Sequence, residues 1–73
     1  MTIYFVERNG IPMAGTARET EELAIALRDH LQQQCATDRF YNPNDLYTVG
    51  QTTTDLPKKK WNDALLLELN RRA

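Results

Sequence analysis

His30 and Cys35 are the two side chains whose types could together supply a base and a nucleophile. They stand five positions apart in a segment with helical spacing, and five residues turn a helix by about 140°, so the two side chains do not face each other. One Cys and one His also cannot fill a structural zinc site, which takes four such ligands. The three glycines are isolated from one another and form no phosphate-binding loop. We therefore predict a protein that is not an enzyme and that has no metal or cofactor.

Lys58, Lys59 and Lys60 form the more informative pattern. They stand at the predicted start of a helix, where each cation meets the positive end of the helix dipole at a cost of a few tenths to about 1 kcal/mol. Natural sequences tend to break such a local rule where function requires it. Two interpretations stay open. The lysines are a contact patch for an acidic protein surface or a phosphate backbone, or they are a solvated turn that nearby Asp55 and Asp63 balance.

The charge distribution bears on nucleic acid as a partner. Nine Lys and Arg against ten Asp and Glu give a formal charge of −1; residues 1–37 carry three basic and five acidic groups, and residues 38–73 carry six and five. Duplex binding usually requires a clearly basic face. Arg71 and Arg72 lie about 18 Å from the three lysines along the same predicted helix. We therefore predict nucleic acid as an accessory contact at most, with a large protein as the main partner.

Exposed aromatic and arginine side chains are further candidates for contact with a protein partner. Tyr4, Arg8 and Phe40 are the residues that we single out. Tyr4 and Phe5 point to opposite faces of the first strand, so we expect one of them to face away from the packed side. A small sheet also has two edges where a partner's extended segment could pair, unless the charges of Glu7 and Arg8 protect the edge.

The elements that would position these residues begin with a hairpin. Residues 2–6 are β-branched and aromatic, and Asn9-Gly10 follows them, which is typical of a type I′ turn with positive φ at both central residues. Residues 11–14 form the predicted returning strand. Because Pro12 cannot donate a ladder hydrogen bond, we expect this strand at an edge of the sheet, or the missing donor of Pro12 to face outward.

A helix is predicted from about Thr20 to Cys35, with either Thr16 or Thr20 as its N-cap. Its apolar stripe consists of Leu23, Leu27 and Leu31. A connection over residues 38–45 leads to a short third strand over residues 46–49, which we expect Gly50 to end. Residues 51–54 are polar and are either a loop or a continuation of the strand.

A second helix is predicted from near Asp55, capped by Asp55 or Thr54, to Arg72. Its packed side consists of Trp61, Ala64, Leu65 and Leu69. The element order is ββαβα, which predicts an α+β fold in which two helices cover a small sheet, in a single domain over residues 1–73.

The length of 73 residues leaves room for one domain. No apolar run reaches the roughly 18–20 residues that span a membrane, and no signal-peptide pattern follows Met1. A lone cysteine suits a reducing compartment, so we expect a protein of the cytoplasm with no membrane contact.

Short length, a single domain, one cysteine and no catalytic set resemble the small host-takeover proteins of bacteriophages. Among these, the chain most resembles the RNA polymerase-binding inhibitors and antiterminators of Xanthomonas phage. The resemblance covers the whole chain by length and general character, and it assigns no individual residue. It implies binding to the N-terminal part of the β′ subunit in a bacterial host cell. It also implies blocked transcription initiation and antitermination, with the factor NusA assisting. Two other classes stay open, an inhibitor of another host machine and a small nucleic-acid-binding regulator that uses residues 58–60.

Overall fold

The computed structural model describes residues 1–37 and 44–72 and confirms the predicted α+β fold with ββαβα order. The sheet has the strand order β2-β1-β3, and β1 is antiparallel to both of its neighbours. The elements are β1 (Thr2–Arg8), β2 (Ile11–Pro12), α1 (Glu21–Thr37), β3 (Tyr47–Thr53), a 3-10 turn η1 (Lys58–Lys60) and α2 (Trp61–Arg72).

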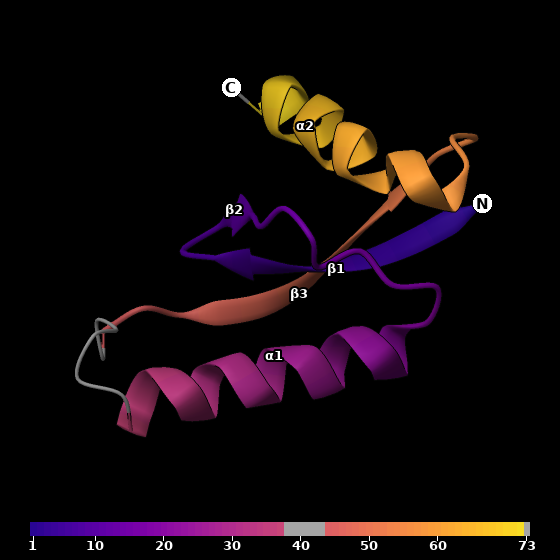
Figure 1. Ribbon diagram of the computed structural model, residues 1–73. Coiled ribbons are helices and arrows are strands. Elements are labelled where there is room, and N and C mark those ends of the chain that lie inside the picture. Colours follow the sequence, from indigo (N-terminus) through magenta and orange to yellow (C-terminus); the bar gives the residue numbers. More distant parts are fainter. Residues whose placement is uncertain (38–43, 73) are drawn as a thin grey trace.

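The two helices lie on opposite faces of the sheet (Figure 1). Successive β1 side chains point to alternate faces, so Phe5 joins a buried cluster with α2, and Val6 joins a second one with α1. The α2 cluster contains Ile3, Phe5, Trp61, Ala64 and Leu65, and the α1 cluster contains Val6, Cys35 and Tyr47 with Leu27 and Leu31 against it. Because a helix covers each face, the expectation that Tyr4 or Phe5 would point away from a single packed side is wrong.

The hairpin forms as predicted, with positive φ at Asn9 (54°) and Gly10 (82°). Arg8 pairs with Ile11, and β2 lies at the sheet edge, as the missing donor of Pro12 requires. The returning strand ends at Pro12 rather than at residue 14. Beyond Pro12, the Thr16 hydroxyl takes the place of a strand acceptor, because its Oγ1 accepts the Val6 N–H at 3.0 Å.

Helix α1 begins one residue after Thr20, whose Oγ1 accepts the Leu23 N–H at 3.3 Å and so acts as the N-cap. Thr16, the alternative cap, is instead buried against β1. Leu27 and Leu31 pack against the α1 cluster as predicted, but Leu23 is 53% exposed. The side that faces the sheet is rotated toward Ala24, Leu27, Leu31 and Cys35, a spacing that follows the helical period.

Strand β3 continues through Gly50 to Thr53, so the expectation that Gly50 ends this strand is wrong. The alternative that the residues after Gly50 continue the strand is confirmed as far as Thr53. Gly50 pairs with Phe5, and a Cβ at Gly50 would lie 2.7 Å from Phe5 Cε2 and 2.6 Å from Glu7 Oε1. The absence of a side chain at Gly50 therefore leaves space for the Phe5 and Glu7 side chains of β1 on this face of the sheet.

Helix α2 begins later than predicted. Pro57 precedes the 3-10 turn, and the α-helix starts at Trp61 rather than near Asp55. Thr54 does not cap the helix, because its Oγ1 accepts the Leu56 N–H two residues on. The predicted packed side is confirmed for Trp61, Ala64 and Leu65. Among the residues that the structure describes, no helix has the length and apolar character needed to cross a membrane.

Candidate functional site

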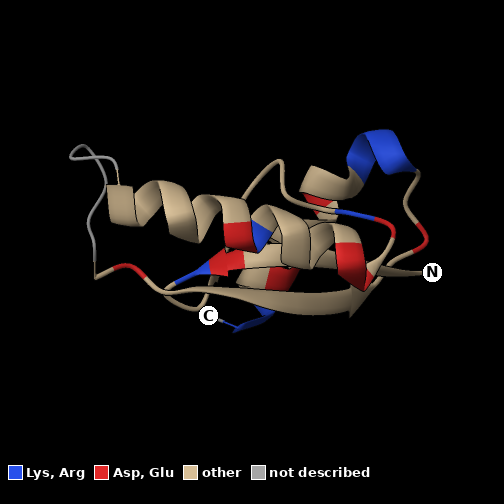
Figure 2. Ribbon diagram, turned by 90° about the horizontal axis from the view of Figure 1, so that it is seen from below, with Lys and Arg blue, Asp and Glu red and all other residues tan. Residues whose placement is uncertain are grey.

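The three lysines of η1 lie together at one end of the molecule, where they form the blue segment at the start of α2 in Figure 2. We call residues 58–60 the basic turn. All three side chains are exposed. Lys58 Nζ lies 3.3 Å from Glu19 Oε1 and 6.0 Å from the centroid of the Trp61 ring. Lys59 and Lys60 form no ion pair with any residue in 1–37 or 44–72.

A shallow hollow of about 160 Å³ lies beside the basic turn. Lys58, Lys59 and Asn62 are among the residues that line it. The Asn62 Oδ1 accepts the Gly15 N–H at 2.7 Å, which ties the loop after β2 to the start of α2. The volume is below the roughly 300–1,000 Å³ of sites that enclose small-molecule ligands. The hollow is therefore too small to enclose such a ligand.

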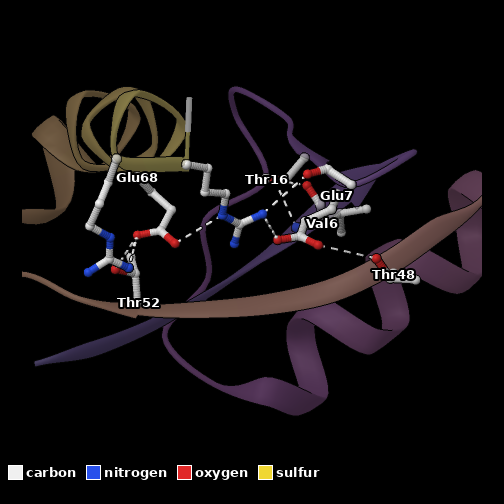
Figure 3. Close-up of polar contacts among 9 residues, drawn as sticks. Val6, Glu7, Thr16, Thr48, Thr52 and Glu68 are labelled. Carbon is white, nitrogen blue, oxygen red and sulfur yellow. Dashed lines mark hydrogen bonds and ion pairs between the residues drawn. The ribbon is translucent and has the colours of Figure 1, made fainter.

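The other cationic end of α2 is engaged within the molecule. Arg71 Nη2 lies 2.5 Å from Glu68 Oε2, and Arg72 Nε lies 3.1 Å from Glu68 Oε1 (Figure 3). The Thr52 hydroxyl also donates to Glu68 at 3.1 Å. Glu68 is buried, yet the hydrogen bond from Arg71, aided by those from Arg72 and Thr52, outweighs desolvation and lowers the pKa of its carboxyl.

Arg72 extends this network to the hairpin. Its Nη1 lies 2.5 Å from Glu7 Oε1 and donates to the carbonyl oxygen of Gly10 at 3.2 Å. The hydrogen bond to Glu7, with the second carboxylate of Glu68, raises the pKa of the Arg72 guanidinium. Arg71 and Arg72, which we considered as contacts for nucleic acid, thus already form ion pairs with carboxylates of the same chain. The basic turn and the end of α2 do not form one basic face.

The remaining predicted contact residues do not gather around the basic turn. Tyr4 is half-buried and shares its face of β1 with Val6, toward α1, whereas the basic turn leads into α2 on the other face. Arg8 is exposed at the end of β1, and Phe40 lies outside the described residues. Glu7 and Arg8 stand on the central strand, so the alternative that their charges protect an edge of the sheet is wrong.

His30 and Cys35, the possible base and nucleophile of the sequence, also lie in different environments. Cys35 is buried against Val6 and Tyr47, while His30 is exposed on α1. Within residues 1–37 and 44–72, no three of the His, Cys, Asp and Glu side chains stand close enough to hold a metal ion.

Sequence reasoning missed the ion pairs at the end of α2, although their signal is present. Glu68 precedes Arg71 by three residues and Arg72 by four, the spacings at which helical side chains meet.

Three comparisons with known proteins complete the description of the site. No protein-family model matches the chain, and no curated protein or solved structure matches it. The site therefore rests on its own geometry.

Proposed function

We propose that this protein is a non-enzymatic regulator that binds a large protein partner through the basic turn. The observation that supports the proposal is the exposure of three adjacent lysines in the 3-10 turn before α2, of which only Lys58 has an ion-pair partner among the described residues. Their mutual repulsion and the helix dipole both disfavour them. An anionic partner surface relieves both effects, and a partner carboxylate fits the hollow beside Lys58 and Lys59.

A protein partner is favoured over nucleic acid by the fate of the remaining charges. Arg71 and Arg72 are bound to carboxylates, and the whole chain carries a charge of −1. The basic turn alone offers three phosphate contacts, which correspond to a slope of about −3 in log affinity against log salt. Such a contact is an accessory to protein binding rather than a means of independent duplex recognition.

Bacterial RNA polymerase is the partner that we propose, with the N-terminal part of its β′ subunit as the surface bound. The support for this choice is the resemblance in length, single-domain build and cysteine content to the phage inhibitors and antiterminators. The consequences are inhibited initiation and readthrough at intrinsic terminators with NusA. An inhibitor of another host machine is the alternative within the same class.

The test is an affinity pull-down from bacterial lysate with the tagged protein, washed at about 300 mM salt to remove weakly held polyanions. We expect stoichiometric β, β′ and α subunits by mass spectrometry. The variant Lys58→Glu/Lys59→Glu/Lys60→Glu should keep the circular dichroism spectrum and weaken binding about tenfold or more, because exposed ion pairs contribute about 0.2–1 kcal/mol each.

The matched control replaces all three lysines by arginine, which keeps the charge and should keep the affinity. Unchanged binding by the glutamate variant would show that the basic turn is only a solvated face. Recovery of another complex would replace the polymerase but keep a protein partner. An empty pull-down together with steeply salt-dependent binding to DNA or RNA would favour the nucleic-acid alternative.

A further inference from the structure

The outer edge of β3 carries peptide groups that no strand covers. At its two ends the ladder to β1 is fixed by hydrogen bonds from the Thr54 N–H to Met1 O and from the Asn9 N–H to Leu46 O, both between directly opposed residues. In an antiparallel pair such residues alternate with residues whose peptide groups point away from the partner strand. The peptide groups of the even-numbered residues of β3 therefore point toward β1, and those of the odd-numbered residues point toward the open edge.

Helix α1 closes the first part of this edge. The Tyr47 N–H donates to Gln32 Oε1 at 3.1 Å, and Arg28 Nη1 donates to Tyr47 O at 3.5 Å. The outward peptide groups of Val49, Gln51 and Thr53 have no hydrogen-bond partner among the described residues. The open stretch is thus three outward residues long, and Gln51 is its centre.

The residues of this stretch do not themselves protect it from pairing. Strand β3 spans seven residues with no charged side chain and no proline, whereas the opposite edge strand, β2, has two residues, one of them Pro12. Short strands, charges and prolines are the usual protection of sheet edges. A hollow of about 290 Å³ is lined by Thr2, Gln51, Thr52, Thr53 and the charged side chain of Arg71.

We infer that this edge pairs with the same edge of a second copy of the chain, about a two-fold axis at Gln51. In that register Gln51 lies opposite Gln51 of the second copy, and Val49 lies opposite Thr53. All three outward residues then satisfy both of their peptide groups, and the sheets join into one of six strands. A register centred on any other residue leaves part of the open stretch unpaired or meets Tyr47, which α1 already covers.

Charge complementarity at the ends supports this occupant. The same register brings Asp55 of the second copy level with Tyr47, because it lies two residues beyond Thr53. At Tyr47 the guanidinium of Arg28, which also forms an ion pair with Asp29, stands beside the edge, with its side chain 36% exposed. Asp55 is exposed as well. A cation and an anion therefore meet twice, once at each end of the symmetric contact.

The experiment is sedimentation equilibrium of the full chain from about 10 µM to about 1 mM, the range in which small interfaces dissociate. We expect a monomer–dimer equilibrium for the wild type. Gln51→Lys and Gln51→Glu each place two like charges across the axis, so each variant alone should dimerise at least tenfold more weakly. An equimolar mixture of the two should restore the dimer. The matched controls Gln33→Lys and Gln33→Glu, exposed on α1, should behave as the wild type.

Amide hydrogen exchange gives an independent readout at the edge itself. The Val49, Gln51 and Thr53 amides should become more protected as the concentration rises, while those of Thr48 and Gly50 stay protected throughout. A wild type that is monomeric at about 1 mM overturns the inference. So does a dimer that Gln51→Lys leaves intact, and failure of the mixture to dimerise overturns the register.

Discussion

Replacing Gly50 with alanine should destabilise the fold through a contact that lies across the sheet. The added Cβ would stand 2.7 and 2.9 Å from Phe5 Cε2 and Cζ, and 2.6 Å from Glu7 Oε1. The Phe5 ring is fully buried, and the Arg72 guanidinium lies 5.8 Å from its centroid, so the ring has no free space to enter. Glu7 is held by Arg72 as well. The strand or the ring must shift.

The magnitude follows from two opposing effects. Overpacking of a filled core costs about 1–3 kcal/mol, while alanine restricts the unfolded chain and contributes about 0.4–1 kcal/mol in return. Positive φ occurs at Gly10 and Gly15 and not at Gly50, so backbone strain adds nothing. We expect a net loss of about 1–2 kcal/mol in the free energy of unfolding, which lowers Tm by about 4–8 °C for each kcal/mol in a domain of this size.

The assay is urea unfolding followed by Trp61 fluorescence and far-ultraviolet circular dichroism. A double-mutant cycle with Phe5→Leu, which shortens the ring that meets the Cβ, should reduce the cost of Gly50→Ala by about 0.5 kcal/mol or more. Gly15→Ala is the matched control, because its Cβ meets nothing within 4 Å although its φ is 81°. That substitution should destabilise by backbone strain and show no coupling to Phe5. A neutral or stabilising Gly50→Ala, or a cost that Phe5→Leu leaves unchanged, would refute the steric argument.

Two further predictions concern buried polar groups. Thr16→Val should destabilise the fold by about 1–3 kcal/mol in urea unfolding, since the buried Val6 N–H loses its acceptor; Thr16→Ser keeps the hydroxyl and should cost clearly less, and an equal cost would contradict the role of the hydrogen bond. The pKa of Glu68 is lowered from its ordinary value of 4.5 by the hydrogen bond from Arg71 above all, so its stabilisation is fully present above about pH 5 and is lost as the pH falls through the lower folded-state pKa. Thermal unfolding from pH 7 to pH 3 should show a steeper loss in the wild type than in Glu68→Gln, and equal slopes would contradict this account.

The hairpin could be predicted from the sequence because its determinants are local. Asn9 and Gly10 dictate the turn themselves, and Pro12 dictates an edge by its own missing donor. The prediction that Gly50 ends the third strand failed because its determinant is not local. Its neighbours in sequence indicate a strand end, while the side chain that requires a glycine there is Phe5, which reaches it across the ladder.

The candidate site could be predicted in part. Exposure of Lys58, Lys59 and Lys60 follows from their charge, and the structure places all three on the surface in one turn. The exposure of the Tyr4 side chain could not be predicted, because it depends on how many helices cover the sheet and on which faces they lie. Two helices on opposite faces bury both sides of β1. The spacing of Glu68 with the final arginines indicates ion pairs, but only the tertiary fold brings Glu7 to Arg72.

Two groups of cations lie at the two ends of α2, and their surroundings differ. The pair at its end neutralises the buried carboxylate of Glu68 and the half-buried one of Glu7, whereas the lysines just before its start remain on the surface. If β3 edges pair about a two-fold axis, the axis stands perpendicular to the joined sheet, so both copies of α2 lie on the same face. Both basic turns then face the same way. A partner with two acidic sites, or two neighbouring partner molecules, would meet two positive contacts held by one sheet, and the second contact would form at high effective concentration. Self-pairing at the edge would thus strengthen the binding of a partner, for which a single basic turn provides only weak contacts.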